Sequence, residues 1–502
     1  MIGSLSMSAL EASGSEVGQK PKTIGTSFET SGVYIVVIAF ACVYYLANAS
    51  LLLCHYDLGW HLAAGDLIRQ RGSVPLQDPW AFTLGDKQWY NLSWLWDVIA
   101  SVVFQHTGFA GLTLLVVACG AVIAGYLTSA CLSSGASALA AGIAVLCACL
   151  LYPAFATPPN VYLAAAPNTA TMLFCVVFYA ECLRRTRLFL LPVMMLLWAN
   201  LHGGFPLGFL ILGVFGAIAL LRRDWKNFKS LGLAAAGCSI AIFVNPLGWH
   251  IYDGVMATLG HFVQGFITEW ESFASNATMP GSIPGIVYLS LFVALELLHR
   301  DSRPIPIEAR LLAWLFLLLG LHQYRYLSFF FLFSAVPLAL HLDRLLPEKL
   351  NGPEVRKPLL AAGIIAVCAM PLTFMHVRPA LVLSDELLSE QDARYLQANS
   401  SHARILNHWN VGGLLIFRTH GTVPIFIDGR AATAYPDSLL RDYLSLPKWN
   451  IDEAAWDRVI EKYKIDAVFW PSVHDVLKHF LVDKRGWKEQ YVGVHETLYV
   501  KP

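Results

Sequence analysis

The chain has 502 residues, of which 56% are hydrophobic and only 14% are charged, and its mean hydropathy is +0.53. A soluble chain of this length needs far more polar surface, so the composition predicts an α-helical polytopic membrane protein. The formal net charge is zero, which gives no reason to expect a nucleic-acid partner.

The chain begins with a polar stretch that is rich in Ser, Gly and Thr. We expect residues 1–32 to form a disordered cytoplasmic tail. The apolar run at 33–54 is too long for the hydrophobic part of a cleaved signal peptide, so we interpret it as a signal anchor.

Apolar runs of helical length recur as far as residue 374. Several are shorter than the ~20 residues that a perpendicular span requires, which indicates tilted or kinked helices. The run at 92–106 is short and contains Asp97, so we expect it not to span, with 137–153 as the alternative. About eleven spans then remain among the runs at 33–54, 92–106, 109–131, 137–153, 165–183, 187–201, 204–221, 230–246, 283–298, 309–322, 326–342 and 357–374.

Basic residues gather in four of the loops between these runs. Cytoplasmic loops of membrane proteins carry an excess of Lys and Arg, so we place these four loops in the cytoplasm. The first loop, 55–91, and everything after residue 375 then face outward. This predicts a membrane domain at 33–375 and an extracytoplasmic α/β domain at 376–502, with the basic loops at 184–187, 222–229, 299–310 and 343–357.

The first outer loop carries the most unusual polar residues. Asp57 and His61 are four residues apart, so a short helix over 57–70 would place them on one face. Asp78 precedes Pro79 in an extended segment. A carboxylate here could accept a proton from a nucleophile or hold a divalent ion, which makes Asp57 and Asp78 the metal candidates. The alternative is that Asp57 only caps the helix and Asp78 only forms a turn.

Three further outward segments offer candidate substrate ligands. "WANLHGGFP" contains Asn200 and His202 beside two glycines, and "EWES" contains Glu269. "LHQYRYL" places Arg325 between two apolar helices, where its planar guanidinium suits a phosphate. The alternatives are helix caps, a satisfied histidine and an arginine that reaches to the lipid headgroups.

The C-terminal quarter alternates short strands with helices, which predicts a small α/β layer. We expect strands at "ARILNHW", "TVPIFIDGR" and "DAVFWP", helices at "VGGLLIFRTHG" and "WNIDEAAWDRVIEKYKI", and a closing hairpin. Asp428 and Arg430 follow the second strand, at a position where ligand sites of α/β domains often lie. A salt-bridged turn is the alternative.

A succession of segments resembles the GT-C type of polytopic glycosyltransferase, and most of all a large bacterial branch of related membrane proteins. The likeness extends from about residue 35 to residue 470. The matching segments are "DLGWHLAAGDLIRQRGSVPLQDPWAFT", "LLWANLHGGFPLG", "NPLGWHIY", "TEWES", "RYLSFFFLFSAVPLAL" and "NHWNVGGLLIF…VPIFIDGRAATAY".

The resemblance implies transfer of a sugar from a polyprenyl-phosphate-type carrier on the outer face of a bacterial inner membrane. It gives Asp57 the essential acidic position of the first outer loop, and Arg325 the contact with the carrier phosphate. The loop lacks a D-x-D or E-x-D pair, so the cofactor is left open between none and a divalent cation, Mg or Mn. "HWNVGG" differs from the matching oligosaccharyltransferase segment at Asn410 and Val411. Recognition of an acceptor peptide is therefore not carried over, and Trp409 stays a candidate substrate ligand.

The resulting prediction is an inverting hexosyl- or pentosyltransferase that modifies an envelope glycan, lipid or protein. Asp57, steered by His61, would act as base or electrostatic stabiliser while the carrier phosphate leaves against Arg325. One alternative is a lipid or glycan flippase, although no inverted repeat is evident. The other is a non-catalytic scaffold whose exported domain binds a partner.

Overall fold

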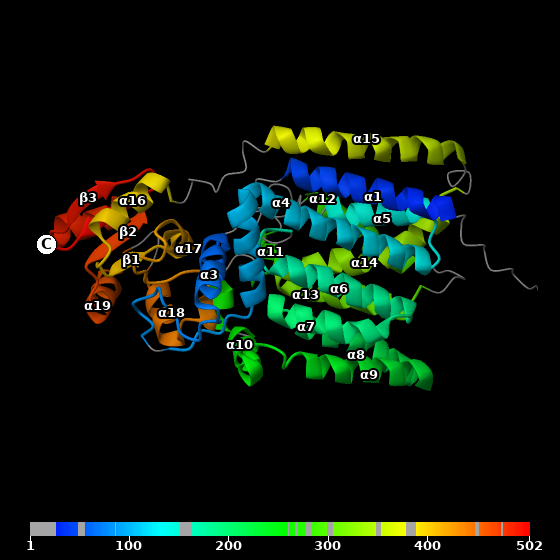
Figure 1. Ribbon diagram of the computed structural model, residues 1–502, viewed down its shortest axis with the longest axis horizontal. Helices are drawn as coiled ribbons and strands as arrows, with labels where there is room; N and C mark the ends of the chain where they lie inside the picture. Colours follow the sequence, from blue (N-terminus) through cyan, green and yellow to red (C-terminus); the bar gives the residue numbers. More distant parts are fainter. Residues whose placement is uncertain are drawn as a thin grey trace, which may run out of the picture.

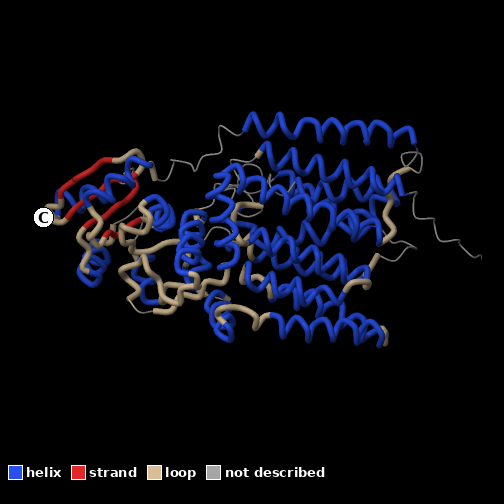
Figure 2. Tube along the Cα trace, viewed as in Figure 1, coloured by secondary structure: helices blue, strands red, loops and turns tan. Residues whose placement is uncertain are grey.

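The computed structural model describes residues 27–48, 56–85, 87–150, 163–259, 261–266, 270–276, 283–298, 305–347, 353–377, 388–446, 451–472 and 475–502. Within these ranges, long apolar helices form a bundle, and a smaller mixed domain sits at one end of it (Figures 1 and 2). We call this the domain end of the bundle.

The bundle helices follow the apolar runs that the sequence predicts. Two helices, Trp94–Ser133 and Tyr324–Leu345, are long and apolar enough to cross a membrane by themselves, and the other described apolar helices are shorter. Helices run along the bundle at α1 (Ser27–Ala47), α4 (Trp94–Ser133), α5 (Ala138–Leu150), α6 (Asn168–Arg184), α7 (Leu191–Leu201), α8 (Pro206–Leu221), α9 (Trp225–Ala241), α12 (Ile283–Leu298), α13 (Ile307–His322), α14 (Leu327–Leu345) and α15 (Pro353–Val377).

Gly108 divides α4 into two parts. Its φ of 63° and ψ of −156° are not helical, and a residue without a Cβ adopts them at little cost. The part before Gly108 lies across the domain end together with α3 (Leu58–Arg71), whereas the part after it runs along the bundle (Figure 1). The segment that contains Asp97 therefore lies crosswise, as expected for a run that does not span.

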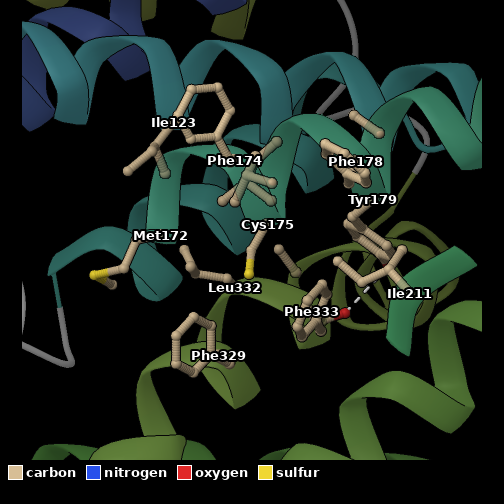
Figure 3. Close-up of a cluster of buried hydrophobic side chains, with 14 of the residues drawn as sticks. Ile123, Met172, Phe174, Cys175, Phe178, Tyr179, Ile211, Phe329, Leu332 and Phe333 are labelled. Carbon is tan, nitrogen blue, oxygen red and sulfur yellow. Dashed lines mark hydrogen bonds between the residues drawn. The ribbon is translucent and has the colours of Figure 1, made fainter. Parts of the chain in front are cut away.

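Aromatic packing fills the centre of the bundle. Phe174, Phe178 and Tyr179 of α6 meet α14, which is buried along nearly all of its length (Figure 3). The Tyr179 hydroxyl donates to the Phe333 carbonyl at 3.2 Å, so the polar tip of this buried ring is satisfied.

The C-terminal domain is built on a four-stranded sheet in the order β1-β2-β4-β3. Only β1 and β2 are parallel, and β3 and β4 form the predicted closing hairpin. Its elements are α16 (Glu390–Asn399), β1 (Ile405–Asn407), α17 (Trp409–Arg418), α18 (Asp437–Leu444), α19 (Glu453–Tyr463), β2 (Ala467–Pro471), α20 (Asp475–Lys478), β3 (Lys488–Val492) and β4 (Glu496–Val500).

The segment "TVPIFIDGR" does not form the strand that the sequence predicts. Ile425 makes only isolated bridges, one to Ile405 and one to Ala81. The backbone of this segment bonds instead to the side chain of Asn407. The Asn407 Oδ1 accepts from the Phe426 N–H at 2.8 Å, and its Nδ2 donates to the Ile427 carbonyl at 2.8 Å. A buried side-chain amide thus replaces a neighbouring strand.

The first loop shares its core with the C-terminal domain. Phe82 N donates to the Ile425 carbonyl, and Ile425 N donates to the Trp80 carbonyl, both at 3.1 Å. Trp60, Trp80 and Trp89 belong to the same buried cluster as the sheet. The loop at 56–91 and the domain therefore fold as one hydrophobic unit, although more than 300 residues separate Phe82 from Ile425 in the sequence.

Glu496 gives the domain a pH-dependent stability. It is 3% exposed, its Oε2 has no hydrogen-bond partner among the described residues, and burial followed by repulsion from Asp392 raises its pKa from 4.5 to about 9. The fold therefore holds the neutral acid, whereas the unfolded chain ionises above pH 4.5. Stability is complete below that pH and falls as the pH rises to 9, by about 3 kcal/mol at pH 7.

We predict that Glu496→Gln removes this fall. Thermal unfolding of the full-length protein in detergent should give similar midpoints for variant and wild type at pH 5 and a higher midpoint for the variant at pH 8. Glu461→Gln, at an exposed position of α19, should leave the profile unchanged. A wild-type midpoint that does not decrease between pH 5 and pH 8 would contradict the prediction.

Candidate active site at the domain end

Asp57 lies at the junction between the first loop and the C-terminal domain. It precedes α3 as its N-cap residue but makes no side-chain capping bond. Its carboxylate instead lies directly over Gly429, where an added Cβ would fall 1.7 Å from Oδ1. Only a glycine leaves room for the carboxylate in this position. The alternative that Asp57 merely caps a helix is therefore not what the structure shows.

Two glycines bring α3 and α17 together. A Cβ at Gly59 would fall 2.5 Å from the Gly413 carbonyl oxygen, so the two backbones approach as closely as they can. This contact fixes the first turn of α3, and with it Asp57, against the domain. Gly413 of "HWNVGG" thus serves helix packing, whereas Gly412 lies against the Ile427 carbonyl.

His61 is a buried imidazole held by a carboxylate. Its Nδ1 lies 2.6 Å from Oδ1 of Asp97, and the Asn91 amide donates to the other Asp97 oxygen at 2.8 Å. His61 is 4% exposed and Asp97 fully buried. His61 lies one turn after Asp57, whose carbonyl accepts the His61 N–H at 3.1 Å, but the His61 side chain bonds to Asp97, which the sequence did not single out as its partner.

His202 lies in the turn between α7 and α8. Its Nδ1 accepts from the Gly204 N–H at 3.2 Å and lies 2.6 Å from the Thr171 hydroxyl. Burial, and then the charges of Arg325 and His61, lower the pKa of His202 to about 3. The ring is therefore neutral at physiological pH, with its proton on Nε2. The charges of Arg325 and His61 both act on His202, so these three side chains belong to the same region of the domain end.

Arg325 stacks on Trp270. Its Cζ lies 4.0 Å from the centroid of the indole ring, a cation–π contact. The backbone supports it, since Tyr324 N donates to the Glu271 carbonyl at 2.8 Å. The "EWES" segment thus reaches the arginine through its tryptophan. Glu269, the residue predicted from that segment, lies outside the described residues.

Asp78, Asp428 and Arg430 form a second, fully buried cluster. Arg430 pairs with both carboxylates, at 2.7 Å to Asp428, and lies 5.1 and 4.9 Å from the ring centres of Trp80 and Trp89. The second Asp78 oxygen accepts the backbone N–H groups of Trp80 and Ala81, at 3.2 and 2.6 Å. Burial alone would lower the pKa of Arg430, but Asp428, Tyr435 and Asp78 raise it well above its ordinary value.

Two other candidates have structural partners. Asn200 accepts from Trp94 Nε1 at 2.9 Å and from Asn245 at 3.1 Å, and donates to the Leu196 and Val244 carbonyls. Trp409 opens α17, and its backbone N–H donates to the Tyr443 hydroxyl at 2.8 Å. Asn200 therefore lies inside α7 and joins it to α4 and to the turn that follows α9, whereas the predicted alternative was a helix cap, and the C-cap residue of α7 is His202.

The predicted metal pair does not fit a divalent cation. Both oxygens of Asp78 are occupied by Arg430 and backbone N–H groups, so only Asp57 of the pair remains as a candidate ligand. Among the residues that the structure describes, no group of three or more His, Cys, Asp or Glu is arranged to hold a metal ion.

Comparison of the whole fold gives clear matches among solved structures. No protein-family model and no curated protein sequence matches the chain. ArnT from Cupriavidus metallidurans, bound to undecaprenyl phosphate, aligns with a TM-score of 0.54 and 14% identity over 93% of this chain and 97% of that one. The oligosaccharyltransferase AglB from Archaeoglobus fulgidus, in complex with an inhibitory peptide and a dolichol-phosphate, aligns with a TM-score of 0.58 and 11% identity over 87% and 69%. The chain has a GT-C fold.

Another structure of the archaeal enzyme, in complex with Zn and sulfate, has a TM-score of 0.52 and 12% identity. At identities of 11% to 14%, these structures are similar to the chain in fold.

Asp97, Trp270 and Gly429 belong to the site although the sequence did not predict them as members. Asp97 could have been noticed as an acid in an apolar helix, and Gly429 as the glycine between Asp428 and Arg430.

The buried cluster predicts a stability defect. Arg430→Met leaves Asp78 and Asp428 buried without a counter-charge, which should lower the free energy of unfolding by about 3–5 kcal/mol. Arg394→Met, which breaks an exposed pair with Glu390 at 3.3 Å, should cost under about 1 kcal/mol. Denaturant unfolding of the full-length protein measures both. An Asp78→Asn variant with wild-type stability and no activity would restore Asp78 as a catalytic candidate.

Proposed function

We propose that the protein transfers a sugar from a polyprenyl-phosphate-linked donor to an envelope acceptor on the extracytoplasmic face of a bacterial inner membrane. The observation that carries this proposal is that Asp57 and His61 at the start of α3, His202 in the α7–α8 turn and Arg325 in the turn before α14 all lie at one end of the bundle, where the charges of His61 and Arg325 act on His202. An acid, two imidazoles and a cation at one end of the bundle suit the displacement of a lipid phosphate from a sugar.

The proposed roles follow from the chemistry of each group. The guanidinium of Arg325 binds the carrier phosphate, and the neutral His202 offers an N–H donor to the same ligand. Asp57 acts as base or electrostatic stabiliser at the anomeric carbon, and the acceptor attacks from the side opposite the leaving phosphate, which inverts the anomer. No proposed step uses a divalent metal ion, because Asp78, one of the two predicted metal ligands, is paired with Arg430.

The proposed orientation places the domain end outside the cell. Basic loops lie at the other end of the bundle, where Arg185 and Arg222 both approach Glu308, at 3.2 and 3.6 Å. Such loops are typical of the cytoplasmic side. The first loop and the C-terminal domain then lie outside, and about eleven helices cross the bilayer. ArnT and AglB are structural neighbours with bound polyprenyl phosphates, which supports a lipid carrier. The acceptor is a glycan, lipid or protein of the envelope.

Deletion of the gene should cause a polyprenyl-phosphate-linked sugar to accumulate while its envelope product disappears. Lipid extraction with mass spectrometry measures the first, and glycan profiling the second. Complementation with wild type should restore both, and Asp57→Asn should fail at equal expression, because the carboxylate is lost. Asp66→Asn, on the same helix, is the matched control and should complement. Unchanged lipid and glycan profiles in the deletion strain would reject the enzyme in favour of a scaffold.

Arg325→Ala should weaken binding of undecaprenyl phosphate at least tenfold, because a charge-assisted phosphate contact is lost. Titration of the purified protein in nanodiscs, read by native mass spectrometry, measures the change. Arg441→Ala is the matched control, since Arg441 also stacks on an aromatic ring, Phe262, at 4.0 Å. Equal affinities for the two variants would remove Arg325 from the carrier site.

A further inference from the structure

We infer that His61, oriented by Asp97, is the group that takes the proton from the attacking acceptor, so that Asp57 serves as the electrostatic stabiliser. This inference rests on the proposed function and chooses between the two roles that it leaves to Asp57. It is carried by the hydrogen bonds and exposure of one imidazole ring.

The hydrogen bond to Asp97 sets the tautomer of His61. Burial raises the pKa of the Asp97 carboxyl, and the charge of His61 and the hydrogen bonds from His61 and Asn91 oppose that rise. With Asp97 ionised, its carboxylate only accepts hydrogen bonds, so the proton of the neutral ring lies on Nδ1, 2.6 Å from the Asp97 oxygen. The lone pair is then on Nε2. A base oriented by a second group through its other nitrogen is the arrangement that proton transfer requires.

The ring is fixed and its Nε2 is open. His61 is 4% exposed, and the Trp60 ring lies 3.6 Å away at an angle of 31°. Asn91 holds the far oxygen of Asp97 at 2.8 Å, so the carboxylate cannot rotate without losing a bond. Among the described residues, none hydrogen-bonds to Nε2 of His61, and this nitrogen keeps some solvent-accessible surface.

His202, on which the charge of His61 acts, has the opposite polarity. Its Nδ1 accepts from Gly204 N, so its Nε2 carries the proton and can only donate. The titratable groups near His61 are Asp57, whose carbonyl accepts the His61 N–H at 3.1 Å, Asp97 on α4, and His202, on which the charge of Arg325 also acts. Of these, only Asp97 forms a hydrogen bond with the His61 ring.

The step balances without a further reactant. The acceptor O–H or N–H loses its proton to Nε2 of His61 while its lone pair forms the bond to the anomeric carbon. The bond from that carbon to the carrier phosphate oxygen breaks, and its electron pair leaves with the phosphate. The imidazolium is stabilised by Asp97 until the proton passes to solvent. The Asp57 carboxylate stabilises the positive charge that develops on the sugar in the transition state.

The test uses the full-length protein in nanodiscs and, as donor, the polyprenyl-phosphate-linked sugar isolated from the deletion strain. His61→Gln and Asp97→Asn should each lower the transfer rate about 100-fold while undecaprenyl phosphate binding stays unchanged. Asp97→Asn should also shift the acidic limb of the pH–rate profile, and imidazole should restore part of the activity of His61→Ala. His250→Gln removes a similar pair, with Asp253 at 2.7 Å on the exposed surface, and should change nothing.

The outcomes separate the two proposals. If no lipid-linked sugar accumulates in the deletion strain, the proposed function fails and this inference fails with it. If transfer is found, and His61→Gln retains most of the rate with an unchanged pH profile, the inference is overturned while the function stands. Loss of carrier binding together with the rate in His61→Gln would also overturn it, because His61 would then be a structural residue.

Discussion

The burial of Arg430 is the interaction on which the arrangement of the domain end depends. A guanidinium with no exposed surface needs counter-charges and hydrogen-bond acceptors. Asp78 and Asp428 supply both, from two segments about 350 residues apart. The ion pair cannot form unless the first loop lies on the C-terminal domain. Once the loop lies there, Gly429 is brought under Asp57, and Gly59 meets Gly413. The position of the proposed catalytic acid is therefore a consequence of a neighbouring salt bridge.

The same pairing determines which charges remain for a ligand. Three carboxylates close to one another would repel a phosphate, and the cost would be large in a poorly hydrated site. Arg430 compensates Asp78 and Asp428 inside the domain, and Asp97 is engaged by His61 and Asn91. Arg325, stacked on Trp270, is then the cation at the edge of the space around His202. The acids that hold the domain end together are thus distinct from the groups proposed to bind the ligand.

The sequence predicted the helices well and the pairings poorly, for a physical reason. Lipid imposes a local rule, a run of apolar residues between polar loops, so the helices could be found from windows of the chain. The break at Gly108 falls between the predicted runs at 92–106 and 109–131. Partner choice follows no local rule: His61 takes Asp97, 36 residues away, although Asp57 is one turn away on the same helix. The prediction of a strand around Ile425 was wrong for a similar reason. β-Propensity predicts hydrogen bonds to a neighbouring strand, but the Asn407 side chain makes these bonds instead.

The candidate residues divide by the same criterion. Asn200, Asp78 and Arg430 were predicted as candidate site residues, and the structure gives each of them partners inside the protein. His61 and His202 were also candidates, but each has one nitrogen bound to the protein and the other without a partner among the described residues. A buried ring that is half satisfied is costly for the fold alone. It becomes favourable when a ligand completes the hydrogen bonds, and a donor and an acceptor facing one space are suited to a ligand that offers both.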